Sequence, residues 1–195
     1  MNRTILPLLL LAAAVLAGCE TPSIRPLASD DKRITDAALV GKWRSEEGDT
    51  YTVQVKDDHY LVVIKDHNKL IGDKWNLEAQ SIQLGKYRFV DIRVAKKERD
   101  TVDERWGPLF VPTHMFARYA VDVGAGSLKL WTLNVGWLSK QSVRPSYTDF
   151  DYVPFDPFDI RVMLTADTRD LQTFLESHAD DPNAFQMKEL KRVKP

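Results

Sequence analysis

Cysteine is almost absent from this chain: a single residue, Cys19, occurs among 195. One cysteine cannot form a disulfide within a monomer, and it cannot build the cysteine ligand sets of structural zinc sites. The length is nevertheless sufficient for one domain with a substantial hydrophobic core. We therefore expect the folded part to be stabilised by packing alone.

The chain also lacks an excess of charge of either sign. Its 27 basic and 28 acidic residues give a formal net charge of −1, and no long basic run occurs. A nucleic-acid-binding surface needs clustered cationic side chains. Nucleic acid is therefore not an expected partner.

Motifs typical of catalytic and metal-binding sites are missing as well. No phosphate-binding loop or dinucleotide fingerprint occurs, and Gly124-Ala125-Gly126-Ser127 lacks the spacing of a nucleophile elbow. The acidic residues between Asp149 and Asp159 lack the Asp-x-Asp-x-Asp-Gly pattern of a calcium loop. The histidines have no metal-ligand spacing and are expected on the surface: His59, His67, His114 and His178. We therefore predict no enzyme, no metal and no cofactor.

No apolar run near the N-terminus is long enough to cross a membrane as a helix. The run from Ile5 to Ala17 has 13 residues, whereas a spanning helix needs about 20. Arg3 precedes this run, which gives residues 1–18 the layout of an export signal. The end of the run, Leu16-Ala17-Gly18-Cys19, resembles the lipobox of bacterial lipoproteins. The alternative is an ordinary export signal with a chance cysteine at its end.

The resemblance to the lipobox implies that Cys19 is acylated and becomes the new N-terminus, so that a membrane is a partner. In lipoproteins of Gram-negative bacteria, Asp after the cysteine is the usual signal for retention in the inner membrane. Glu20 stands there in this chain, which favours the outer membrane and a domain facing the periplasm. Prolines, serines and mixed charges predict a flexible tether over 19–37, followed by a single domain over 38–195.

The remainder of the chain is rich in aromatic and β-branched residues, which alternate with polar ones as they do in half-buried strands. The pattern predicts strands at 40–44, 51–55, 60–64, 75–79, 88–94, 115–123, 128–135 and 160–164. A helix is predicted to begin at Asp167 or Thr168, and a final strand at 185–193. The expected fold class is mainly β: an antiparallel barrel or curled sheet of about eight strands, one short helix near the C-terminus and a last strand.

Gly41-Lys42-Trp43 on the first predicted strand resembles the Gly-x-Trp motif of lipocalins. The resemblance implies a structural role, in which Trp43 lies across one end of a barrel and packs on a basic residue from a late strand. Gly41 would permit close backbone approach there. Two features depart from the family. The nearest match to the lipocalin Thr-Asp-Tyr, which lies between the sixth and seventh strands, is Thr148-Asp149-Phe150, which lacks the Tyr and falls after the seventh predicted strand. Only a short turn at Gly48 follows the first strand. The domain is therefore described as lipocalin-like.

Two charged residues stand inside apolar strands and are candidates for contact with a ligand. If Asp91 and Arg118 point inward, they could orient the polar head of a molecule held in the barrel. If they point outward, they are ordinary surface charges. Arg93 stands in the same apolar strand as Asp91, and for it the outward interpretation is preferred. The expected ligand is a small apolar or amphipathic molecule such as a fatty acid.

The segment 147–158 carries Tyr147, Phe150, Tyr152 and Phe155 between prolines and acidic residues. These aromatic side chains could form a lid across the barrel mouth, a patch that contacts another envelope protein, or a connector pinned to the core. The segment therefore supports an alternative function, that of a protein-interaction or inhibitor module.

Overall fold

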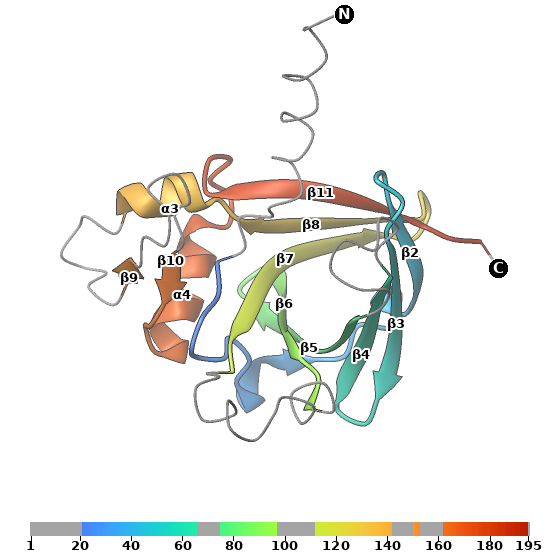
Figure 1. The fold of residues 1–195 in the computed structure, drawn as a ribbon, viewed down its shortest axis with the longest axis horizontal. Helices are drawn as coiled ribbons and strands as arrows, with labels where there is room; N and C mark the ends of the chain where they lie inside the picture. The colour runs from blue at the N-terminus through green and yellow to red at the C-terminus, as the bar shows by residue number, and fades with distance from the viewer. Residues whose placement is uncertain (1–20, 66–74, 97–111, 142–149, 153–161, 195) are drawn as a thin grey trace, which may run out of the picture.

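The computed structural model describes residues 21–65, 75–96, 112–141, 150–152 and 162–194 (Figure 1). Eight strands form a closed antiparallel barrel, in which each strand pairs with two neighbours. Around the barrel they are β2 (Gly41–Ser45), β3 (Thr50–Lys56), β4 (His59–Lys65), β5 (Trp75–Leu84), β6 (Tyr87–Val94), β7 (His114–Asp122), β8 (Ser127–Leu133) and β11 (Phe185–Arg192). The predicted fold class is confirmed, because β6 pairs with β5 while β11 lies between β8 and β2.

The secondary structure after β8 differs in detail from the prediction. The strand predicted over 128–135 ends at Leu133, because Asn134 accepts a hydrogen bond from Trp137 N–H at 3.2 Å and begins helix α3 (Val135–Gln141). The strand predicted at 160–164 exists as β10 (Val162–Leu164). It pairs with β9 (Phe150–Tyr152) and takes no part in the barrel.

Helix α4 (Thr168–His178) is the predicted C-terminal helix. Asp167 caps it, because its side chain accepts a hydrogen bond from Asp170 N–H at 3.0 Å. Leu171, Phe174 and Leu175 lie on one face at helical spacing and are buried. They belong to a cluster that contains Phe89 and Phe116 from the barrel wall, so α4 covers the outside of the barrel.

Two separate hydrophobic clusters follow from the alternation of side chains along each strand. The barrel interior is filled by residues from the eight strands, among them Trp43, Tyr60, Val90, Tyr119 and Leu190. The second cluster lies between the outer wall and the elements that cover it, and it includes α4, α3 and Leu27. The molecule is thus a barrel with one side of its wall buried under additional layers.

The flexible tether predicted over 19–37 is wrong from Thr21 onward. Residues 21–39, called the strap below, pack along the barrel and contain a 3-10 turn at Asp30–Lys32, strand β1 (Arg33–Ile34) and a 3-10 turn at Ala37–Leu39. Ser23 and Leu27 are completely buried. Ser23 exchanges two backbone hydrogen bonds of 2.8 Å with His114, and β1 pairs with β5. The folded domain therefore includes residues 21–37, which the prediction assigned to the tether.

Candidate functional site

One end of the barrel is closed around Trp43, as the resemblance to lipocalins implies. The indole is fully buried and donates to Leu39 O at 2.9 Å. The guanidinium of Arg192, from the last strand, lies 4.2 Å above the ring and donates to the carbonyls of Val40 and Ala38. Gly41 has a φ of 140°, and a Cβ there would lie 2.5 Å from Arg192 Nη1. The motif residues are thus used for packing.

Hydrogen bonds between the strap and side chains of the barrel interior close the same end of the barrel, the one that contains Trp43. Tyr60 Oη accepts from Asp36 N–H at 2.7 Å, and Tyr119 Oη donates to the Asp36 carboxylate at 3.1 Å. Arg88 forms an ion pair with that carboxylate at 2.8 Å, and Ser81 bonds to Tyr119. Burial raises the pKa of Tyr119 and that of Tyr60. Polar contacts between the strap and the barrel thus hold the margin of this closed end in place.

The opposite half of the barrel presents apolar side chains that the core does not fully bury. Val62, Ile92 and Leu130 face the interior and are only partly buried against the interior cluster. Met115 and Ile64 lie further toward this end, on the same faces of β7 and β4, and are also half-buried. We call this part of the barrel the open half.

Charged residues stand at the rim of the open half. Lys188 lies two residues before Leu190, on the same inward face of β11, and forms an ion pair with Glu47 at 3.1 Å. Hydrogen bonds from its own backbone N–H and from Ser45, together with Lys188, lower the pKa of Glu47 to about 2. Burial opposes the charge of Lys188, but Tyr51 and Glu47 outweigh it and raise the pKa of that ammonium.

The strap begins at the open half. A small pocket of about 60 Å³ lies there, lined by Thr21, Ile92, Met115, Phe116, Ala117, Thr132 and Leu133. Thr21 is 7% exposed, and its hydroxyl has no hydrogen-bond partner among the residues that the structure describes. Met115 and Thr132 stand at the ends of β7 and β8 that are remote from Trp43. The first described residue of the chain therefore lies beside the open end.

Asp91 points away from the barrel interior, so the inward alternative is wrong for this residue. Its neighbours Val90 and Ile92 face inward, which places the carboxylate on the outer wall. Asp91 is 4% exposed and accepts hydrogen bonds from the N–H groups of Leu27 and Ala28 at 2.7 and 3.0 Å, and it bonds His114 Nδ1 at 2.7 Å. Asp91 thus fastens the strap to the wall.

Arg118 also lies on the outer wall, opposite Trp131 across β7 and β8. Its guanidinium sits 4.3 Å from the Trp131 ring and 5.6 Å from that of Tyr87. It donates to Ala179 O directly after α4. These contacts make Arg118 a residue that secures the helix.

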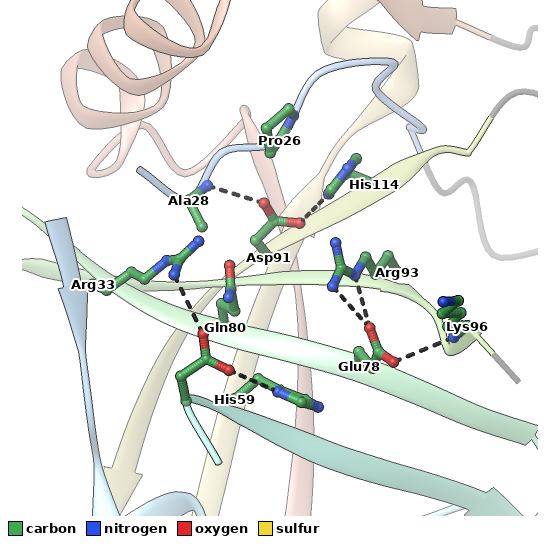
Figure 2. Close-up of a pocket in the computed structure, with 11 residues that line it drawn as sticks. Pro26, Ala28, Arg33, His59, Glu78, Gln80, Asp91, Arg93, Lys96 and His114 are labelled. Carbon is green, nitrogen blue, oxygen red and sulfur yellow. Dashed lines mark hydrogen bonds and ion pairs between the residues drawn. The ribbon is translucent and has the colours of Figure 1, made fainter. Parts of the chain in front are cut away.

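A polar groove of about 460 Å³ lies on the outer wall between the strap and strands β4 to β7 (Figure 2). Its lining is Pro26, Ala28, Arg33, Asp58, His59, Glu78, Gln80, Asp91, Arg93, Lys96 and His114. The side chains of His59 and His114 are only 16% and 13% exposed, so the expectation of surface histidines is wrong for these two. Each has Nδ1 against a carboxylate, that of Asp58 or Asp91.

The sequence gives only a weak signal for this groove. Along β5 and β6 the residues Glu78, Gln80, Asp91 and Arg93 alternate with apolar ones, as on any solvent-facing wall. The groove arises because the strap covers part of that wall, and nothing in the spacing of residues 21–39 indicates where they dock.

Several predicted residues lie outside the described part of the chain, namely Cys19, His67, Tyr147 and Phe155. Phe150 and Tyr152 belong to β9, whose backbone pairs with Leu164 and Val162. The role proposed for the aromatic segment 147–158 therefore stays a prediction.

His178, at the end of α4, lies against Trp137 with ring centroids 5.1 Å apart.

Within the described ranges, no group of three or more His, Cys, Asp or Glu side chains could hold a metal ion. In those same ranges, no helix has the length and apolar character needed to span a membrane. Comparison with known proteins finds no matching family model, no matching curated protein and no matching solved structure.

Proposed function

We propose that this protein is a lipid-anchored binding protein of the bacterial envelope, which holds a small apolar or amphipathic molecule in the open half of its barrel. One observation carries the proposal: interior-facing Val62, Ile92 and Leu130 are incompletely buried although they line a closed barrel. The interior of an eight-stranded barrel is either filled by its own side chains or wide enough for one small ligand. Apolar surface left accessible in such a site is the surface that a ligand would cover.

The rim suits a ligand with a polar head. Lys188 supplies an ammonium group, and its side chain remains 43% exposed despite the ion pair with Glu47. A carboxylate or phosphate at the end of an acyl chain would meet this charge while the chain occupied the apolar interior. A fatty acid or a singly acylated lipid is therefore the ligand class that we favour.

The position of the strap supports a membrane-facing mouth. Thr21 is buried beside the open end, and the cysteine of the lipobox-like sequence stands two residues before it. Two residues span at most about 7 Å. An acylated Cys19 would consequently hold the open half close to the bilayer, and an outer-membrane location with the domain in the periplasm completes the proposal.

The anchor is tested by the substitution Cys19→Ser in the full chain expressed in a Gram-negative bacterium. Labelling with a fatty-acid analogue should then be lost, and the protein should leave the membrane fraction, because the thiol is the acyl acceptor. Wild-type protein without acyl chains by mass spectrometry would contradict the anchoring.

Ligand binding is tested with a dansyl-labelled undecanoic acid, whose fluorescence rises in an apolar site. Val62→Trp should fill the open half and weaken binding about tenfold or more. Val63→Trp is the matched control, because this neighbour on β4 faces outward. Equal binding by both variants, with thermal unfolding unchanged, would exclude the barrel as the site while leaving the anchor untouched.

A further inference from the structure

The polar groove on the outer wall is built from interactions that fix its floor. Glu78 accepts from Arg93 Nε at 2.9 Å and from Lys96 N–H at 3.2 Å. Burial opposes the ionisation of Glu78, but these bonds outweigh it and keep its pKa below the usual value. Asp91 ties the opposite side of the groove to the strap. A wall held in this way is preorganised, which lowers the cost of binding.

The acidic groups of the groove are already engaged. Asp91 has three partners, Glu78 is held by Arg93 and Lys96, and Asp58 contacts His59 at 3.0 Å and Arg33 at 3.5 Å. Each carboxylate of the lining thus already has donors of the protein as partners, which offset its negative charge.

The donors of the groove, in contrast, keep unused hydrogen-bonding capacity. Arg33 forms ion pairs with Asp30 and Asp58 at 3.2 and 3.5 Å, but no side-chain hydrogen bond with any described residue. The Gln80 amide and the Lys96 ammonium likewise have none in the part of the chain that the structure describes. Figure 2 shows Arg33 and Arg93 on opposite sides of Gln80, with Lys96 beyond Arg93. The donors thus converge on the groove from two directions.

We propose that this groove binds a small polar molecule through a carboxylate or phosphate group, which lies over Gln80 between Arg33 and Arg93. Guanidinium groups match both oxyanions in geometry, and the ammonium of Lys96 adds a mobile positive charge. The volume of about 460 Å³ accommodates an organic body of the size of a sugar or an amino acid. The lining is polar, so this ligand differs in class from the apolar one proposed for the barrel, and the two sites are independent.

The test is calorimetric titration of the full chain with three soluble probes: inorganic phosphate, glycerol 3-phosphate and succinate. At least one should bind with a dissociation constant of about 1 mM or less. Arg33→Gln should weaken that binding about tenfold or more, since a charged donor is lost. Lys42→Gln removes the same charge from the exposed outer face of β2 and should leave binding unchanged.

A second variant keeps the test independent of folding effects at Arg33. Gln80→Leu retains the size of the side chain and all charges while it removes the amide, and it should also weaken binding. Thermal unfolding of each variant confirms that the fold is retained. The proposal is overturned if none of the probes binds at about 10 mM, or if folded Arg33→Gln and Gln80→Leu bind as well as Lys42→Gln.

Discussion

At the scale of single residues, Gly41 and Arg192 show how the closed end depends on close approach. The guanidinium of Arg192 occupies the space that a side chain at position 41 would need. From there it covers the buried indole of Trp43 and satisfies two carbonyls of the strap and β2 junction, at Ala38 and Val40. The positive φ of 140° and this close approach together favour glycine at the first position of β2.

Gly41→Ala should lower the free energy of unfolding by about 2–3 kcal/mol, through backbone strain at positive φ and displacement of Arg192. Urea denaturation followed by tryptophan fluorescence measures the change. Gly124→Ala is a suitable control, because its Cβ would meet only Asp122 at an ordinary 3.4 Å. A variant at position 41 as stable as this control would contradict the role given to the motif.

At the scale of elements, α4 and the strap differ in how far the sequence predicts them. Helix α4 has an N-cap residue and apolar positions at helical spacing, so local pattern and final structure agree. The strap has Pro22, Pro26 and scattered charges, which resemble a linker, and Leu27 is one of few strong apolar residues in it. Its docking comes from Asp91, 64 positions away, and such distant partners leave no local periodicity.

Leu27→Ala tests whether the strap is part of the folded unit. Leu27 is completely buried in the cluster beneath α4, so the loss of its side chain should cost about 2–5 kcal/mol. Hydrogen exchange of the amides of Leu27 and Ala28 should accelerate at the same time. Met187→Ala removes a side chain that is 54% exposed and should have little effect. Equal stability of the two variants would restore the interpretation of a tether.

At the scale of the whole molecule, the alternation of apolar and polar residues along the strands predicts the barrel class, because each strand must bury one of its faces. Pairings such as β11 with β2 connect opposite ends of the chain. These pairings determine the stagger of the strands, and with it which end of the barrel is closed and which half is open. The groove depends further on the strap. Candidate residues in the strands could therefore be named from sequence, whereas the direction in which Asp91 and Arg118 point could not.

Acid should weaken the whole fold in a defined interval of pH. Glu47 has a folded pKa of about 2, against about 4.3 when unfolded, so its contribution is present above pH 4.3 and is lost as the pH falls toward 2. Glu78, whose pKa is also lowered, acts in the same direction. Midpoints of urea unfolding measured from pH 7 to 2 should decline in this interval.

Glu47→Gln should make that decline shallower, since one titrating group with a lowered pKa is removed. The exposed neighbour Glu46→Gln provides the matched control. A profile for Glu47→Gln that parallels the profile of the control would exclude the rim pair as a source of acid sensitivity.

The position of β11 between β2 and β8 has a consequence for biosynthesis. A nascent chain that has not yet released residues 185–192 from the ribosome possesses seven strands with two unsatisfied edges, and such edges recruit other chains. Closure must wait until residues 185–192 have been translated. A product that ends before residue 185 should accordingly be prone to aggregation, and a chaperone bound until residues 185–192 emerge should suppress it.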